Sequence, residues 1–230
     1  MQVFTASEEE ILNRTLSEIE SKHCVRVLRK KNGDKINVTD GKGNLYECII
    51  LNAHSKYCEF SIQKTIRQNK TTPPLHIVIA PTKNIDRFEF FLEKSSEIGI
   101  QEITPLLAFH SERKNIKQER LEKIVISACK QSKNFHFPIL NKLTSFKEVL
   151  KSKVPQKFIA HCEAQNKKEL KDFSFEEETL ILIGPEGDFS TKEIKEAIEA
   201  GFKPISLGKS RLRTETAGIV ACTTVNLNFD

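Results

Sequence analysis

The 230-residue sequence shows neither the residue pattern expected of a secretory signal nor that expected of a membrane-spanning helix. Its first residues, Met1-Gln2-Val3-Phe4, do not show the basic and then apolar stretch of a secretory signal. No apolar run approaches the roughly 20 residues that a membrane-spanning helix requires. Because 38% of the residues are hydrophobic, the chain can still bury a core. We therefore expect a soluble, cytoplasmic protein with no membrane partner.

The cysteines contain no Cys-x-x-Cys pair. This absence argues against zinc ribbons and against thioredoxin-like redox chemistry. We expect reduced thiols, which are ordinary core residues in a cytoplasmic protein, and no metal site. The six cysteines are Cys24, Cys48, Cys58, Cys129, Cys162 and Cys222.

The sequence also lacks a strong excess of one charge. The 36 lysines and arginines are nearly balanced by 31 acidic residues, which leaves a formal net charge of +5. Many soluble proteins carry such an excess, so charge alone only suggests a nucleic-acid partner.

The glycine pattern lacks both common nucleotide-binding loops. Gly208-Lys209-Ser210 resembles the end of a P-loop, but the required earlier glycine would fall at Lys203. Gly41-x-Gly43 lacks the third glycine of a dinucleotide-binding loop and lies in an expected hairpin. The sequence therefore supports neither nucleoside triphosphate nor NAD binding.

The N-terminal part has the pattern of a small β-rich module. We expect an acidic helix over residues 7–20 and short strands over 36–39, 46–51 and 58–62, separated by turn residues. The basic residues of this part could follow an RNA backbone, although a solvated basic surface explains them equally well. These residues are Arg26, Arg29, Lys30, Lys31, Lys35 and Lys42.

A polar segment over 64–74 ends in Pro73-Pro74 and interrupts both helix and sheet pairing. We place the domain boundary there, which gives domains 1–70 and 71–230. Beyond it, apolar strands alternate with amphipathic helices, which predicts an α/β domain with a mainly parallel sheet. The expected strands cover 75–80, 102–107, 158–161, 180–183 and 205–207, with a weaker one near Ile139. The expected helical core residues are Phe88, Phe91, Leu92, Ile98, Leu121, Ile124, Val125, Ala128 and Cys129.

Two of these strands end in glycine-marked turns. The strand 180–183 runs into Gly184-Pro185-Glu186-Gly187, and Ser190 with Glu193 then forms a capping box that starts a helix, which Gly201 stops. The strand 205–207 ends at Gly208 and leads through a polar loop into the last helix. Because strand ends and helix starts expose backbone N–H groups, the sequence predicts a ligand site where the two turns meet.

The motifs at 184–190 (Gly-Pro-Glu-Gly-Asp-Phe-Ser), 207–208 (Leu-Gly) and 212–217 (Leu-Arg-Thr-Glu-Thr-Ala) resemble the RsmE family of ribosomal RNA small subunit methyltransferases. Weaker landmarks at 23–28, 94–99 and 103–105 extend the resemblance over the whole chain. It implies S-adenosylmethionine as methyl donor and N3 of a uridine in small-subunit (16S) ribosomal RNA, free or in the 30S subunit, as target. It also implies a SPOUT-type C-terminal domain with a trefoil-knotted, mainly parallel sheet and helices on both faces, an N-terminal PUA-like small β-barrel, and an obligate homodimer.

The resemblance assigns residues to three roles by position. The donor-binding residues are His161, Ile183, Gly184, Pro185, Glu186, Gly187, Ser206, Leu207, Gly208, Leu212, Thr214, Thr216 and Ala217. The RNA-binding residues are Arg26, Arg29, Lys30, Lys94, His110 and Arg113. Catalysis falls to Arg213 or Arg211, which would stabilise the uracil anion, and to a carboxylate base, with Glu215 first and Asp188 a distant second.

The chain departs from the family pattern at three places. Asp188 replaces a common second glycine, and aspartate is among the residues that best tolerate φ > 0. His110 stands where an arginine is common, and residues 129–134 replace a Glu-Gln and later Arg pattern. These changes affect the expected RNA contacts and leave the reaction class unchanged.

Other functions stay open at this point. Another SPOUT target, such as a ribose 2′-O or a tRNA base, is the main enzymatic alternative. A non-enzymatic ribosome-assembly factor would keep the basic module but would not need glycine-lined donor loops. A hydrolase would need a nucleophile pair, and His161-Cys162 is only adjacent in sequence, with no third group.

Overall fold

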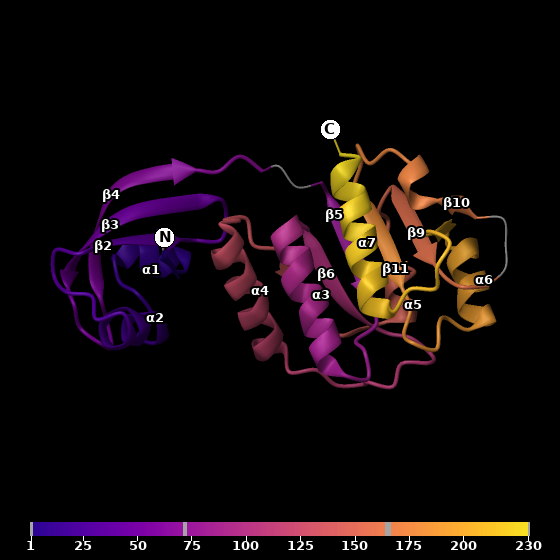
Figure 1. Cartoon of the computed structure of the whole chain (residues 1–230), viewed down its shortest axis with the longest axis horizontal. Coiled ribbons are helices and arrows are strands. Elements are labelled where there is room, and N and C mark those ends of the chain that lie inside the picture. The colour runs from indigo at the N-terminus through magenta and orange to yellow at the C-terminus, as the bar shows by residue number, and fades with distance from the viewer. Residues whose placement is uncertain (1, 71–72, 164–166, 230) are drawn as a thin grey trace. The chain divides into compact units, whose positions relative to one another are not determined.

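The computed structural model describes residues 2–70, 73–163 and 167–229, and the chain forms two compact units (Figure 1). The first unit contains Met1–Lys70 and Cys129–Phe137, and the second contains Thr71–Ala128 and Pro138–Asp230.

The first unit is built on a four-stranded sheet in the order β1-β2-β3-β4. The strands are β1 (Val3–Thr5), β2 (Lys35–Thr39), β3 (Asn44–Asn52) and β4 (Glu59–Arg67). β1 pairs with β2 in parallel, and the other neighbouring pairs are antiparallel. Phe4 and Phe60 from the strands are fully buried in one apolar cluster with Leu16 and Cys24, so the sheet and the helical segment share a core.

The single helix expected over residues 7–20 is wrong, because the chain forms two short helices there. They are α1 (Glu8–Asn13) and α2 (Glu18–Lys22), and the π-helical turn η1 (His23–Val27) follows. Ser7 and Ser17 cap the two starts. Arg14 has φ 58°, the left-handed geometry that ends helices, and Thr15 then pairs with Glu59. Pairing with the sheet therefore replaces the middle of the expected helix.

The segment Cys129–Phe137 joins the first unit through backbone contacts with the turn between β2 and β3. The N–H of Gly43 donates to Phe135 O at 2.8 Å, and the N–H of Phe137 donates to Gly41 O at 2.8 Å. Both glycines have positive φ, and a Cβ on either would overlap the ring of His136 or Phe137. Gly41-x-Gly43 thus serves chain packing, in agreement with the rejection of a nucleotide loop.

The second unit contains an eight-stranded sheet in the order β10-β12-β9-β11-β5-β6-β7, with β8 paired to β6. Its strands are β5 (Leu75–Ile79), β6 (Glu102–Leu107), β7 (Ile139–Leu140), β8 (Thr144–Ser145), β9 (Gln156–Ala160), β10 (Lys168–Glu169), β11 (Thr179–Ile183) and β12 (Lys203–Ser206). All of their pairings are parallel. The expected α/β domain with a mainly parallel sheet is confirmed.

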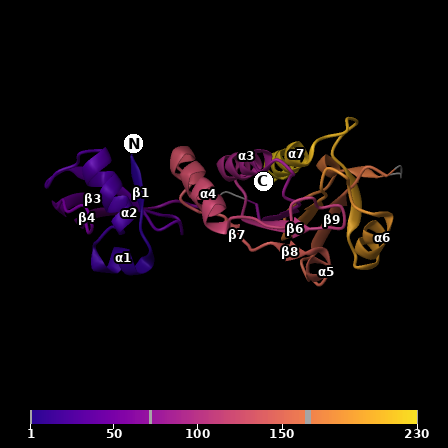
Figure 2. The ribbon, with the colours of Figure 1, turned by 90° about the horizontal axis from the view of Figure 1, so that it is seen from below.

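Helices cover both faces of this sheet, as expected. Figure 2 shows α3 and α7 on one face and α5 and α6 on the other. The helices are α3 (Ile85–Ile98), α4 (Gln118–Ser132), α5 (Phe146–Val149), α6 (Thr191–Glu199) and α7 (Thr214–Leu227), with the short 3-10 helix η2 (Leu170–Asp172). Ile98, expected in the core, is 37% exposed, because it is the last residue of α3 before Gly99 turns the chain at φ 113°.

α7 is held tightly along its length. At its middle, a Cβ on Gly218 would lie 2.6 Å from the Phe91 ring of α3 and 2.8 Å from Ile79 Cδ1 of β5. Near its end, the Asn226 side-chain amide donates to Gly99 O at 2.7 Å, just beyond α3. The helix is therefore fixed both to α3 and to the sheet.

Candidate active site

Parallel pairing places the carboxyl ends of β9, β11 and β12 at the same edge of the sheet, where ligands of open α/β sheets bind. The loops after these strands enclose a pocket of about 650 Å³. It is lined by Ala160, His161, Cys162, Lys167, Ile183, Gly184, Pro185, Glu186, Asp188, Ile205, Ser206, Leu207, Gly208, Lys209, Ser210, Arg211, Leu212, Arg213, Thr214 and Ala217. The two glycine-marked strand ends therefore meet in one cavity.

The loop after β11 is a tight turn closed by Asp188. Its N–H donates to Pro185 O at 2.9 Å, and its φ of 62° is the left-handed geometry expected at this position. Its carboxylate accepts the N–H of Cys162 at 2.7 Å and that of Phe189 at 2.8 Å. Asp188 thus ties the loop after β9 to the loop after β11.

The predicted start and stop of α6 are confirmed. Ser190 and Glu193 form the capping box in both directions. Gly201, at φ 88°, follows the last residues of the helix and donates its N–H to Ile198 O. The Phe189 ring packs closely against Gly184, because a Cβ on Gly184 would lie only 3.1 Å from the ring carbons. Glycine therefore permits this close packing.

The loop after β12 is bonded to the loop after β11. The Ser206 hydroxyl accepts the N–H of Gly208 at 3.2 Å and shapes the turn, in which Gly208 has φ 121°. At the start of α7, the Thr214 hydroxyl donates to Gly184 O at 3.1 Å. The walls of the pocket are therefore joined by a direct hydrogen bond.

His161 supplies an unusual buried polar group. His161 is only 7% exposed, and neither of its ring nitrogens has a hydrogen-bond partner among the described residues. Burial, and then the charge of Lys167, lowers the pKa of His161 below its ordinary value of 6.5. The ring is therefore neutral at pH 7 and offers one donor and one acceptor to a ligand.

Cys162, beside it, is not an activated nucleophile. Partial desolvation by the pocket walls, and then the neighbouring Asp188 carboxylate, raises the pKa of the Cys162 thiol above its ordinary value, although the residue as a whole is exposed. A thiol that holds its proton is a poor nucleophile, which disfavours the hydrolase alternative.

Arg211 and Arg213 both line the pocket and are exposed. Glu215 is not among the lining residues. It is buried, with its Oε1 3.9 Å from Arg87 Nε of α3, and its Oε2 has no hydrogen-bond partner among the described residues. Gly187 and Thr216 also lie outside the lining. The other predicted donor-binding residues all line it.

Two of the expected RNA-binding residues lie at the rim of the pocket. The His110 ring Nδ1 is 3.1 Å from Asp188 O. Arg113 donates from Nε to Thr82 O at 3.0 Å and from Nη2 to Lys83 O at 2.6 Å. The N–H of Lys83 donates to Glu186 at 2.9 Å. The loops after β5 and β6 are therefore attached to the loop after β11.

Sequence reasoning missed several lining residues. They are Ala160, Cys162, Lys167, Ile205, Lys209 and Ser210. All but Lys167 directly adjoin or lie between predicted site residues, so extending each motif to its neighbours would have found them. Lys167, whose ammonium donates to His161 O, carries no such signal.

Among residues 2–70, 73–163 and 167–229, no group of three or more His, Cys, Asp or Glu side chains is arranged to hold a metal ion. No helix in that part of the chain combines the length and apolar character needed to cross a bilayer.

Comparisons with known proteins assign this site to a family. A family model described as an RNA methyltransferase domain matches residues 68–226, and one described as an RNA methyltransferase PUA domain matches 16–63. The chain is 32% identical over 232 residues to ribosomal RNA small subunit methyltransferase E of Buchnera aphidicola subsp. Acyrthosiphon pisum, covering 91% of this chain and 86% of the relative. The chain belongs to the RsmE family. It is an RNA methyltransferase.

Solved structures agree with RsmE membership. A "probable rRNA-methyltransferase" from Porphyromonas gingivalis superposes with a TM-score of 0.90 and 40% identity, covering 99% of each chain. Ribosomal RNA small subunit methyltransferase E from Neisseria gonorrhoeae, solved bound to S-adenosyl methionine, has a TM-score of 0.84 and 27% identity, covering 100% of this chain and 98% of that chain.

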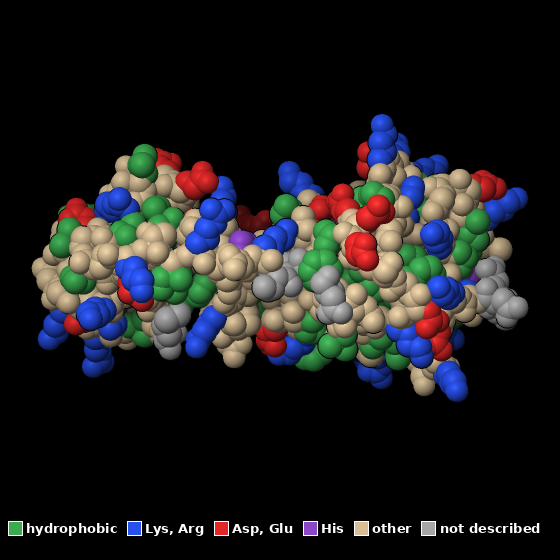
Figure 3. Space-filling model, turned by 90° about the horizontal axis from the view of Figure 1, so that it is seen from above, with side chains coloured by type: hydrophobic (Ala, Val, Ile, Leu, Met, Phe, Trp, Pro, Cys, Tyr) green, Lys and Arg blue, Asp and Glu red, His purple; other side chains and the backbone are tan. Residues whose placement is uncertain are grey.

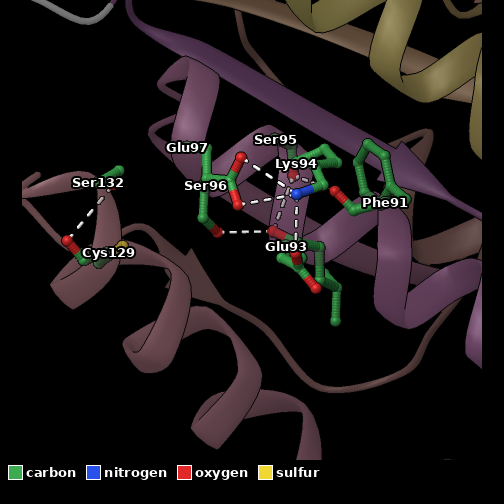
Figure 4. A network of polar contacts seen from close by, with 9 residues as sticks. Phe91, Glu93, Lys94, Ser95, Ser96, Glu97, Cys129 and Ser132 are labelled. Atoms are coloured by element: carbon green, nitrogen blue, oxygen red, sulfur yellow. Dashed lines mark hydrogen bonds and ion pairs between the residues drawn. The ribbon is translucent and has the colours of Figure 1, made fainter.

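The remaining RNA-binding residues predicted from the RsmE resemblance differ in whether their partners are charged carboxylates or neutral oxygens. Lys94 on α3 pairs with Glu93 at 2.7 Å and with Glu97 at 3.0 Å. Figure 4 shows its ammonium group between the two carboxylates. In the first unit, Arg26 reaches the Ser55 hydroxyl at 3.4 Å, and Lys30 reaches Lys35 O at 3.4 Å. On the face in Figure 3, basic side chains are scattered among acidic ones and do not form one patch.

Proposed function

We propose that this protein methylates N3 of a uridine in small-subunit ribosomal RNA, using S-adenosylmethionine bound in the strand-end pocket. The observation that carries this proposal is the pocket itself, whose glycine-marked walls are joined by the bond from Thr214 to Gly184. The RsmE structure from Neisseria gonorrhoeae, solved with S-adenosyl methionine, supports the choice of donor.

The residues of the pocket fit a donor of this kind. An adenosine moiety presents a flat apolar ring with hydrogen-bonding edges, and the pocket offers apolar side chains from Ile183, Leu207 and Leu212. The turns around Gly184 and Gly208 bring main-chain polar groups close to a ligand. His161 adds a buried imidazole whose nitrogens are unpaired among the described residues. When bound, the donor supplies an electrophilic methyl group on a sulfonium centre.

The chemistry left to the protein is to position the base and to stabilise its deprotonated form. Uridine N3 carries a proton that must leave as the methyl group arrives. Arg213 and Arg211 line the pocket, and a guanidinium beside the uracil carbonyls favours the N3 anion. We propose Arg213 as the principal stabilising residue because it stands at the start of α7, next to Thr214.

The proton acceptor in this proposal is Glu215, with Asp188 second. Glu215 has one carboxylate oxygen without a hydrogen-bond partner among the described residues, although it lies outside the pocket lining. Asp188 lines the pocket, but both of its oxygens accept backbone N–H groups. A Glu215→Gln enzyme that binds donor and RNA normally and still methylates at the wild-type rate would remove Glu215 from this role.

The proposed function is tested by mass spectrometry of small-subunit ribosomal RNA after incubation with the protein and isotopically labelled S-adenosylmethionine. We expect label in N3-methyluridine, and its loss in Arg213→Ala. Arg120→Ala is the matched control, because Arg120 pairs with Glu89 on the surface of the same unit and lies outside the pocket. Label in a ribose 2′-O-methyl group, or in tRNA alone, would contradict the proposed target.

The homodimer and the trefoil knot belong to the same proposal. α3 and α7 pack against each other yet leave large apolar side chains exposed, with Phe90 at 49% and Leu227 at 78%. A second copy packed on α3 and α7 would cover these exposed side chains. The chain passes from β12, near one edge of the sheet, back to α7 against β5 and β11, a path that is consistent with a knot. Sedimentation equilibrium tests the dimer, and a monomer at micromolar concentration would contradict it.

A further inference from the structure

Phe109 presents its ring to solvent beside the pocket. It follows β6 at the same edge of the sheet and is 77% exposed. Its ring packs edge-on against the ring of His110, with the ring centroids 5.0 Å apart and the planes at 74°. Two adjacent aromatic side chains therefore stand together on one short loop.

The outward position of Phe109 is fixed by buried groups of the second unit. Its N–H donates to Glu193 Oε1 at 2.8 Å, and Glu193 is only 7% exposed. Ala108 donates its N–H to the Ser111 hydroxyl at 2.9 Å, and Ser111 is also buried. Because the backbone N–H groups of Ala108 and Phe109 are both bonded to buried side chains, the loop holds the Phe109 ring in solvent.

His110 connects this ring to the pocket. Its Nδ1 lies 3.1 Å from the carbonyl oxygen of Asp188, which lines the pocket. Gly187 leaves room for the His110 side chain, because a Cβ on Gly187 would lie only 3.1 Å from His110 Cβ. The aromatic pair is thus braced against the loop after β11.

We propose that Phe109, supported by His110, is a stacking residue for an unpaired base of the RNA substrate at the mouth of the pocket. This inference rests on the proposed function and adds the group that receives the base. A base must leave its helical stack to react, which costs a few kcal/mol. Aromatic rings replace the lost stacking without regard to base identity. Phosphate contacts cannot replace the stacking that the base loses.

The experiment measures the KM for an unpaired-uridine RNA, kcat, and the donor dissociation constant for wild type, Phe109→Ala and Phe109→Trp. We expect Phe109→Ala to raise the RNA KM by roughly fivefold to 150-fold, the usual range for one base–aromatic stack. Donor affinity should stay at the wild-type value, and Phe109→Trp should keep the wild-type KM. Ile198→Ala is the control, because Ile198 is an exposed apolar residue on α6 of the same unit.

The absence of tryptophan from the sequence gives a second readout. In Phe109→Trp the new indole is the sole tryptophan, and stacking with a uridine oligonucleotide should quench its fluorescence. The matched Ile198→Trp variant should show no quenching.

An unchanged RNA KM in Phe109→Ala, or equal quenching at positions 109 and 198, would overturn the inference. A changed sedimentation coefficient in Phe109→Ala would also overturn it, by assigning the ring to contact between copies. If wild type methylates no RNA, the proposed function itself fails. If wild type methylates RNA and Phe109→Ala does so with the same KM, only the stacking role fails.

Discussion

Substitution of Asp188 separates two contributions that this residue makes, its hydrogen bonds and its tolerance of φ 62°. The carboxylate accepts two backbone N–H groups at 2.7 and 2.8 Å. A hydrogen bond to a charged group contributes about 1.5–3 kcal/mol. Asp188 is half-exposed and Cys162 is exposed, so water can replace part of each bond and the lower end applies. The two bonds together then contribute about 3 kcal/mol.

These values predict an order among three variants. Asp188→Asn keeps one acceptor oxygen and tolerates the left-handed geometry, so it should cost about 1.5 kcal/mol of unfolding free energy. Asp188→Gly loses both bonds without strain and should cost about 3 kcal/mol. Asp188→Ala adds about 1 kcal/mol for a Cβ in the left-handed region and should cost about 4 kcal/mol.

The assay is urea denaturation followed by circular dichroism, combined with hydrogen exchange at the amides of Cys162 and Phe189. Both amides should lose protection in the Gly and Ala variants. Asp34→Ala is the control, because Asp34 accepts a single backbone N–H, from Lys31, and is not among the residues with positive φ. If Asp188→Ala proved as stable as wild type, or more stable than Asp188→Gly, the reasoning would be refuted.

Three further predictions concern the core, pH and salt. Gly218→Ala should destabilise the protein by about 1–3 kcal/mol, because the added Cβ would overlap Phe91 and Ile79. A Tm equal to that of wild type would contradict this packing. The pKa of His161 is lowered by burial, so below its ordinary value of 6.5 the unfolded chain takes up a proton that the folded chain does not. Stability should therefore fall as pH drops from 6.5 toward the lowered pKa, and a Tm series from pH 8 to 5 should show a weaker dependence in His161→Gln. Arg26→Ala and Arg29→Ala should each lower the salt dependence of RNA binding by about 0.7 in the log–log slope, and an unchanged slope in filter binding would exclude a phosphate contact.

Hydrophobic periodicity predicted the strands of the second unit that are short apolar runs, such as β5, β6 and β11. It gave no signal for the two-residue polar strands β8 and β10. The strand expected over 102–107 coincides with β6. The order of the strands could not be predicted, since parallel neighbours such as β5 and β11 are joined by contacts distant in sequence. The entry of Cys129–Phe137 into the first unit was equally hidden. It depends on backbone bonds to Gly41 and Gly43, which no local pattern announces.

In the site, too, the features that depend on neighbouring residues could be predicted, and those that depend on residues distant in sequence could not. The glycine turns and the capping box are local, and the sequence predicted them. Glu215 was proposed for its closeness in sequence to Arg213, which lines the pocket. Its ion pair with Arg87 of α3 could not be predicted, because that contact joins residues distant in sequence. The exposure of Phe109 could not be predicted either, because it depends on the buried carboxylate of Glu193, 84 residues away.

The bonds at the two ends of α7 give that helix a mechanical role. Thr214 is bonded to the loop after β11, and Asn226 is bonded to Gly99 beyond α3. A helix of 14 residues spans about 21 Å, and its ladder of main-chain bonds makes it stiff along its axis. α7 therefore connects the pocket wall to the residues that follow α3. A spin label or fluorine probe near Gly99 would record whether ligand entry beside Gly184 displaces this connection.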